Sequence, residues 1–239
     1  MKNFLKLLKE LTLDFLFPKT CINCQREGFY LCEDCFFLID IFDRQYCPFC
    51  QQPNVVPDGK TCSSCRRSKK LNGVFCATSY EDIIVKRLIH RFKYEPYIKE
   101  LSGPLSNLII AHLQKTNKLK EVREFLLVPV PLHKSKLKYR GFNQAEEIAK
   151  NLSEKLDLLM RNDILRKIKR TESQVNLPKE ERERNLRDVF VCQNQKAVRN
   201  KKILLVDDVL TTGSTLEECA RLLKQAGAKE VWGVVVARG

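Results

Sequence analysis

Four C-x-x-C pairs near the start of this 239-residue chain constrain its fold more than any other feature. A two-residue spacer lets a tight turn point both sulfurs at one ion, and two such pairs complete a tetrahedral zinc site. We therefore predict two structural zinc ions, held by eight cysteines: Cys21, Cys24, Cys32, Cys35, Cys47, Cys50, Cys62 and Cys65.

The spacing leaves open how the four pairs combine. Sequential pairing, first with second and third with fourth, is favoured over interleaved or nested pairing. Redox-active cysteines, disulfides, a single zinc and an iron–sulfur centre are the alternatives to two zinc ions. A zinc ion with four cysteine ligands has no open coordination position, so we expect no catalysis at either metal. Since residues 18–78 hold too few apolar side chains for a large core, zinc binding would supply folding free energy, on the order of 10 kcal/mol per site.

Residues 1–17 are predicted to form an amphipathic helix, because apolar side chains recur at helical spacing and Pro18 follows. This helix either docks on the rest of the protein or faces a membrane surface or a partner. Charged residues interrupt the apolar run, and no small-residue cleavage site follows it. We therefore expect no transmembrane segment and no signal peptide. The expected location is the cytoplasm, with the inner face of the membrane as a further option.

From residue 79 onwards, helical and strand patterns alternate. Continuously apolar strands that alternate with helices predict an α/β fold, a parallel sheet with helices on both faces. We divide the chain into the helix at 1–17, a cysteine-rich double zinc-ribbon module at 18–78 and this α/β domain at 79–239. The expected helices span residues 81–93, 101–113, 143–158 and 214–226, and the expected strands span 125–130, 202–206 and 231–237.

The stretch ILLVDDVLTTGST at residues 203–215 carries the clearest chemistry. An apolar strand leads into two carboxylates, then a small hydroxyl-rich turn, then a helix. Backbone N–H groups at a turn and a helix N-terminus bind phosphate, and carboxylates accept hydrogen bonds from sugar hydroxyls or hold Mg²⁺. The pattern predicts a site for a phosphorylated sugar, formed by Asp207, Asp208, Thr211, Thr212, Gly213, Ser214 and Thr215.

The same stretch resembles the 5-phosphoribosyl-1-pyrophosphate (PRPP) loop of type I phosphoribosyltransferases. The resemblance implies binding of PRPP with Mg²⁺. It also implies that Asp207 and Asp208 engage the ribose hydroxyls and that residues 211–215 bind the 5′-phosphate. Purine-specific members have a carboxylate where Thr211 stands. Its absence argues against a hypoxanthine-type enzyme.

The whole chain is similar to the ComF (ComFC) family, which is associated with natural DNA transformation. The resemblance rests on the four C-x-x-C pairs, LIHRFKY at 88–94, VPVPLHKSKLKYRGFNQA at 128–145, Gln174 to Asn185, and the PRPP loop. It implies a type I phosphoribosyltransferase-like domain behind a double zinc ribbon. It further implies a role in handling single-stranded DNA, with a ComFA-type DNA translocase and other competence proteins as partners.

In the wider family, the segment after the strand at 125–130 is the pyrophosphate-binding loop. The resemblance implies five candidate ligands there: Lys134, Lys136, Arg140, Asn143 and Gln144. The alternative is that Arg140 to Phe142 form only a helix-entry turn, with Phe142 in the core. Residues 170–187 are polar and form either a hood over the site or a solvated loop.

Two functions of different classes remain. The net charge of +14, concentrated in residues 115–140 and 161–187, favours a PRPP-binding protein that also handles single-stranded DNA. The alternative is an active phosphoribosyltransferase, unrelated to DNA, which moves ribose-5-phosphate from PRPP to an unidentified acceptor. No general base or acceptor site is evident, so no catalytic residue is assigned.

Overall fold

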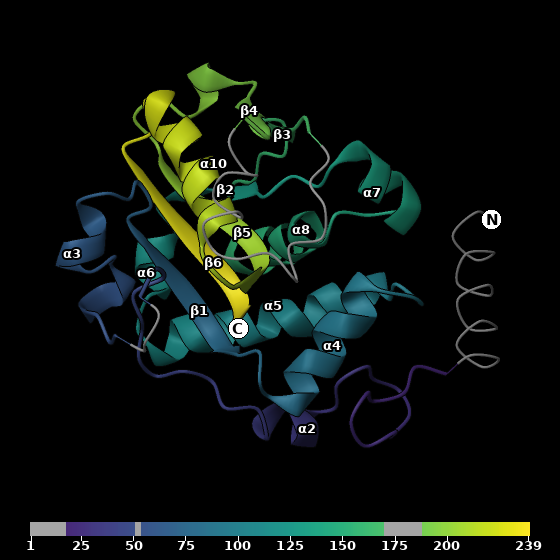
Figure 1. The fold of residues 1–239 in the computed structure, drawn as a ribbon. Helices are drawn as coiled ribbons and strands as arrows, with labels where there is room; N and C mark the ends of the chain where they lie inside the picture. Colours follow the sequence, from purple (N-terminus) through teal and green to yellow (C-terminus); the bar gives the residue numbers. More distant parts are fainter. Residues whose placement is uncertain (1–17, 51–53, 170–187) are drawn as a thin grey trace.

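The computed structural model describes residues 18–50, 54–169 and 188–239, and a four-stranded parallel sheet lies at its centre (Figure 1). The strand order is β1-β6-β5-β2. Non-consecutive strands lie side by side because helical crossovers connect them. The strands are β1 (Gly73–Ser79), β6 (Glu230–Arg238), β5 (Lys202–Leu210) and β2 (Phe125–Pro129).

The alternation of side chains along the central strands divides the core into two layers. Leu204 and Val206 of β5 pack on one face of the sheet, whereas Ile203 and Leu205 pack on the other. Both faces are buried, which explains why these strands are apolar throughout. The first face is covered by α4 (Ile83–Lys93), α5 (Ser102–Lys115) and α8 (Gln144–Leu156), and the second by α10 (Ser214–Gln225) (Figure 1).

The predicted fold class is confirmed, and the predicted helices and strands correspond to α4, α5, α8, α10, β2, β5 and β6. Three features differ from the prediction. Strand β1 begins at Gly73, before the predicted boundary at residue 79. Strand β5 continues to Leu210, through both carboxylates. The segment after β2 contains a helix, α7 (Lys134–Arg140), where we expected a loop.

The remaining elements are short. A two-stranded antiparallel sheet, formed by β3 (Leu165–Lys167) and β4 (Phe190–Cys192), lies beside α10. The others are α2 (Glu33–Phe37), η1 (Pro57–Gly59), α3 (Ser63–Arg66), η2 (Lys99–Leu101), α6 (Leu119–Val122) and η4 (Gln195–Ala197).

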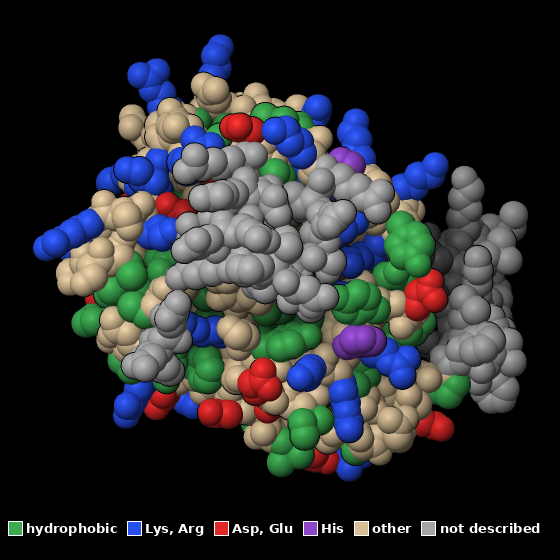
Figure 2. All heavy atoms as spheres, viewed as in Figure 1, with side chains coloured by type: hydrophobic (Ala, Val, Ile, Leu, Met, Phe, Trp, Pro, Cys, Tyr) green, Lys and Arg blue, Asp and Glu red, His purple; other side chains and the backbone are tan. Residues whose placement is uncertain are grey.

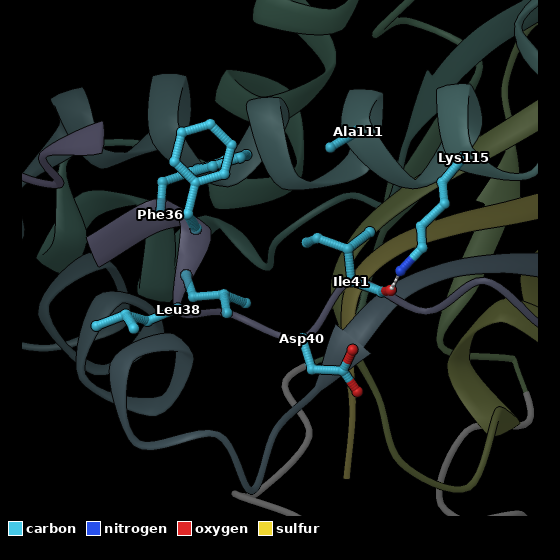
Figure 3. A pocket seen from close by; sticks show the side chains of 8 residues that line it. Phe36, Leu38, Asp40, Ile41, Ala111 and Lys115 are labelled. Carbon is cyan, nitrogen blue, oxygen red and sulfur yellow. Dashed lines mark hydrogen bonds between the residues drawn. The ribbon is translucent and has the colours of Figure 1, made fainter. Parts of the chain in front are cut away.

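The segment between the two cysteine-rich parts is tied to α5. Lys115 Nζ donates a hydrogen bond to the Ile41 carbonyl at 2.7 Å (Figure 3). His112 Nδ1 lies 2.8 Å from the Phe42 carbonyl oxygen. A hollow of about 430 Å³ lies between this segment and α5, and Phe36 and Leu38 line its apolar side (Figure 3). The first cysteine-rich part is therefore attached to the α/β core and does not hang from a free linker.

Two predictions fall on residues that the structure does not describe. The N-terminal helix at 1–17 and the hood at 170–187 both lie outside the described residues. Within the described ranges, no helix is long and apolar enough to cross a membrane. The division into segments 1–17, 18–78 and 79–239 stays a prediction.

Candidate phosphate-binding site and metal centres

Two adjacent carboxylates lie near the carboxyl end of β5. Successive side chains of a strand point to opposite faces, so Asp207 and Asp208 point to different sides of the sheet. Asp208 is buried, and one of its oxygens lies 2.8 Å from Nζ of Lys93, the last residue of α4. Lys93 lies in the LIHRFKY motif, but sequence reasoning assigned it no role. Its partner is more than a hundred residues away, and only the fold brings the two together.

Burial is the largest single influence on the pKa values of Asp207 and Lys93. Burial and, to a smaller extent, the charge of Asp208 raise the pKa of Asp207, Lys93 opposes both, and the net pKa is about 7. Burial lowers the pKa of Lys93, but its ion pair with Asp208 outweighs this and leaves that pKa above its usual value. The two carboxylates therefore differ: Asp208 has the half-buried Lys93 as its counter-ion, whereas Asp207, on the other side of the sheet, borders the hollow at the turn.

The turn after β5 has the geometry of an anion site. Gly213 has a φ of +75°, in the left-handed region that favours glycine. Helix α10 starts at the next residue, Ser214, whose backbone N–H donates a long hydrogen bond of 3.4 Å to the Thr212 hydroxyl. The hydroxyl oxygens of Thr212 and Ser214 lie 2.8 Å apart, and a small hollow is lined by Asp207 and residues 209–216. Backbone N–H groups of the first helical turn and two hydroxyls converge there, an arrangement that suits an anion.

Two lysines approach the same site from α7 and β3. Burial lowers the pKa of Lys167, and the charge of Lys136 lowers it further, whereas Asp207 raises it. Lys167 therefore lies within electrostatic reach of both Lys136 and Asp207. Lys136 is one of the predicted pyrophosphate ligands. Lys167 was not singled out, because in sequence it is one cation among many in a basic segment.

Of the other predicted pyrophosphate residues, Lys134 and Arg140 lie on α7, whereas Asn143 and Gln144 lie at the start of α8. Three of these four side chains form hydrogen bonds within the protein. Gln144 accepts a hydrogen bond from Arg140 Nη1 at 2.5 Å and donates one to the Phe92 carbonyl at 3.3 Å. Asn143 donates to a backbone carbonyl just after β2 at 3.0 Å. Phe142 is buried, with its ring centroid 5.4 Å from that of Phe92. Ligand roles for Arg140, Asn143, Gln144 and Lys134 stay predictions.

The eight predicted zinc ligands form two groups of four in sequential order. In each group the sulfur atoms all lie within 4.8 Å of one another. Three sulfur pairs lie at 3.6, 3.8 and 3.9 Å, close to the edge of about 3.8 Å that four Zn–S bonds of about 2.3 Å imply. The residues therefore fit structural zinc. The two groups are Cys21, Cys24, Cys32 and Cys35, and Cys47, Cys50, Cys62 and Cys65.

The second tetrad lies against the phosphate-binding turn. Phe49 stands between the zinc ligands Cys47 and Cys50 in the sequence. A Cβ atom added at Gly213 would lie 3.0 Å from its ring. The guanidinium of Arg238, at the end of β6, donates to the carbonyl oxygens of Cys47 and Cys50 at 3.0 and 2.8 Å. The second zinc loop therefore forms one wall of the turn, a contact that nothing in the sequence signals.

A second contact fixes the module to α10. The carboxylate of Glu217, in the first turns of the helix, accepts hydrogen bonds from the backbone N–H groups of Lys70 and Leu71 at 2.7 and 3.0 Å. Burial raises the pKa of Glu217, and these two hydrogen bonds oppose that shift. The phosphate-binding turn is thus held between the sheet and the second zinc module.

Comparison with known proteins agrees with this architecture. Residues 137–239 match the phosphoribosyl transferase domain, and residues 12–66 match the double zinc ribbon domain. Competence protein F of Haemophilus influenzae is 31% identical over 230 residues, which cover 91% of this chain and 96% of that protein. Competence protein ComFC of Streptococcus pneumoniae is 28% identical over 202 residues, 84% of each chain.

A further relative is the DNA utilization protein YhgH of Escherichia coli, 33% identical over 150 residues, 61% of this chain and 64% of that protein. The zinc ribbon, the phosphoribosyltransferase-like sheet and the likeness over almost the full length of competence protein F confirm the expected family. This chain belongs to the ComF (ComFC) family of competence proteins.

Proposed function

We propose that this protein binds PRPP with Mg²⁺ at the turn after β5 and acts in the handling of incoming single-stranded DNA. The observation that carries the PRPP part is that Asp207 and Asp208 lead directly into a hydroxyl-rich turn and a helix N-terminus. Carboxylates suit the ribose hydroxyls and Mg²⁺, and the turn suits the 5′-phosphate. A phosphorylated ribose with an anionic leaving group requires both features together.

The cations around the site support the pyrophosphate half of PRPP. Lys167 lies within electrostatic reach of Asp207, with Lys136 in reach of Lys167, and the two lysines can neutralise phosphate charge on that side. On the other side, Lys93 compensates Asp208 before the ligand arrives. Mg²⁺, when bound, would neutralise further negative charge on pyrophosphate. The residues of this chain position the ribose, hold the 5′-phosphate and surround the pyrophosphate with positive charge.

The DNA part of the proposal rests on the family and on charge. The relatives are named as competence and DNA utilization proteins, and this chain carries a net charge of +14. A location in the cytoplasm or at the inner face of the membrane, next to a ComFA-type DNA translocase and other competence proteins, fits this role.

The alternative is an active phosphoribosyltransferase with an unidentified acceptor. The presence of every predicted donor-site residue supports this alternative. No acceptor site is identified, and Thr211 stands where purine-specific enzymes have a carboxylate. Incubation with labelled PRPP and Mg²⁺, with and without DNA and cell extract, separates the two functions. Pyrophosphate release with a labelled product would establish turnover. Bound but intact PRPP supports the binding function.

Calorimetric titration of PRPP with Mg²⁺ tests the site directly. Asp207→Asn plus Asp208→Asn should abolish binding, because neutral amides bind diols and Mg²⁺ poorly. Since Asp208→Asn leaves the half-buried Lys93 without its partner, Asp207→Asn alone is a milder variant, expected to weaken binding about tenfold or more. Thr212→Val should cost roughly 1–3 kcal/mol through a lost hydrogen bond to a charged group.

Asp40→Asn plus Asp43→Asn provides the matched control, because both carboxylates are exposed and lie outside the site. This control should bind PRPP as the native protein does. Zinc content should stay at two per chain in every variant. Unchanged PRPP affinity in both the double variant and Asp207→Asn would contradict the assignment.

A further inference from the structure

A basic groove lies between the first zinc module and α4, on a surface that the proposed PRPP site does not use. It encloses about 510 Å³. Helix α4 contributes Lys86, Arg87, His90 and Arg91, and the loop between Cys21 and Cys32 contributes Asn23 and Gln25. The volume falls in the range of small-ligand sites. No carboxylate is among the described residues that line it.

The four α4 side chains share one exposed face of the helix. They stand at positions i, i+1, i+4 and i+5, which project to the same side. The opposite face of α4 is buried in the core, with Leu88, Ile89 and Phe92 fully covered. This packing holds the basic face in place. Lys and Arg side chains reach the surface over α4 in Figure 2.

The cations of the groove have no anionic partner in the parts of the chain that the structure describes. Arg87 is held only by a 3.4 Å hydrogen bond to Asn23 Oδ1, and Lys86 lies 5.7 Å from the centre of the Tyr80 ring. No ion pair within those parts involves Lys86, Arg87 or Arg91. Elsewhere on the same surface, lysines and arginines pair with carboxylates, as Lys99 does with Glu147. Unpaired, closely spaced cations repel each other, and an anion relieves that repulsion.

An aromatic ring continues the basic row. Tyr94 follows α4, is 47% exposed, and its ring centroid lies 4.9 Å from that of His90. Basic side chains that follow a backbone, beside an exposed ring on which a base can stack, are the features of single-strand binding. A protein partner with an acidic patch would use the cations but would have no need for the ring.

We propose that this groove binds the phosphodiester backbone of single-stranded DNA. The inference rests on the DNA part of the proposed function and adds the surface that carries it. It also gives the first zinc module a task, because Asn23 holds Arg87 in the groove. The same helix ends at Lys93, which contacts Asp208, so α4 runs from the DNA groove to the proposed PRPP site.

The test is the binding of a fluorescent oligothymidylate strand, followed by anisotropy at several salt concentrations. Each phosphate contact on a single strand contributes about 0.7 to the slope of log affinity against log salt. Arg87→Ala plus Arg91→Ala should therefore reduce the slope by about 1.4 and weaken binding at least tenfold at low salt. PRPP affinity and zinc content should not change.

Two controls accompany this variant. Lys196→Ala plus Lys201→Ala removes two exposed charges outside the groove, and it should leave the slope nearly unchanged. Arg87→Lys plus Arg91→Lys keeps the charge, and it should restore most of the slope. If the native protein binds the strand and the Arg87/Arg91 alanine variant retains its full slope, the groove assignment is wrong while the proposed function stands. If the native protein binds no strand, the DNA part of the proposed function fails as well.

A competition experiment distinguishes a DNA strand from a small phosphate as the ligand of the groove. The Asp207→Asn plus Asp208→Asn variant should still bind the strand, and pyrophosphate should compete no better than chloride at equal ionic strength. Displacement by micromolar pyrophosphate in that variant would overturn the assignment in favour of a small phosphate ligand.

Discussion

The two cysteine tetrads share a sequence motif but have different surroundings. Cys21, Cys32 and Cys35 form a small cluster of their own with Leu31 packed against it. In the second tetrad, Cys47 belongs to the same apolar cluster as strands β5 and β6. One zinc module is therefore attached to the α/β domain, and the other is part of its core.

The loop between the first two ligands of each tetrad shows the same contrast. In the first module, Asn23 contacts Arg87 on α4 and borders the basic groove. In the second, Phe49 lies against Gly213 in the phosphate-binding turn. Two tetrads of the same composition therefore contact different parts of the protein, because the residues between the metal ligands decide what each loop touches.

Loss of one zinc ligand should give the largest difference between the modules. Cys21→Ser and Cys62→Ser should each lose about one zinc, and zinc binding is worth on the order of 10 kcal/mol per site. Cys62→Ser should unfold the α/β core or lower its melting temperature strongly, because the second tetrad shares that core. Cys21→Ser should leave the core folded. Metal analysis and thermal unfolding measure both effects, and equal losses of stability would remove the distinction.

Phe49→Ala should have the next largest effect on stability. The ring is 8% exposed and fills the space beside Gly213, so its removal should cost about 3 kcal/mol of unfolding free energy. Phe29→Ala is the control in the first module, because its ring is 58% exposed, and it should cost under about 0.5 kcal/mol. Denaturant titration compares the two. A Phe49 loss as small as that of Phe29 would show that the second loop does not pack on the turn.

Asp207→Asn should stabilise the protein at high pH. The pKa of Asp207 is raised to about 7, above its ordinary value of 3.8, so the folded state holds a proton that the unfolded state has lost. Stability therefore falls as pH rises from about 4 to 7 and then stays low. Above pH 7 the amide should gain roughly 1–2 kcal/mol, and at pH 4 it should gain little. Melting curves across this range test it, and an equal gain at both pH values would contradict burial as the cause.

Glu217→Gln should have the smallest effect. The amide keeps one acceptor oxygen, so about one of the two hydrogen bonds to Lys70 and Leu71 is lost, at about 1 kcal/mol. Glu154→Gln, on the exposed side of α8, serves as the control and should change nothing measurable. Denaturant midpoints resolve the difference. If both substitutions are neutral, Glu217 does not fasten the second module to α10.

The sequence predicted the features that depend on local pattern. The cysteine spacing, the apolar strands and the turn at residues 211–213 each carry their signal within a short stretch. Strand β1 was missed because its pairing with β6, Gly73 beside Trp232, joins distant parts of the chain. The strand at 202–206 was predicted too short because two carboxylates look like its end, whereas Asp207 still pairs with Val235 in the ladder.

Two residues around the site escaped prediction for the same physical reason as strand β1. Lys93 meets Asp208, and Phe49 meets Gly213, only after the chain has folded. Neither contact leaves a periodicity or a spacing in the sequence. The short helix α7 escaped detection because most of its seven residues are exposed and polar, so it has no buried stripe to reveal it.

The central claim is that the two zinc modules serve different ligands, and matched substitutions in their loops test it most directly. PRPP affinity by calorimetry and oligothymidylate affinity by anisotropy are measured for Phe49→Leu and Asn23→Ala, with two zinc ions verified in each. The account predicts a crossed result: Phe49→Leu weakens PRPP roughly threefold to tenfold and spares DNA, whereas Asn23→Ala weakens DNA by a similar factor and spares PRPP. Both substitutions affecting the same ligand, or neither affecting any, would contradict it.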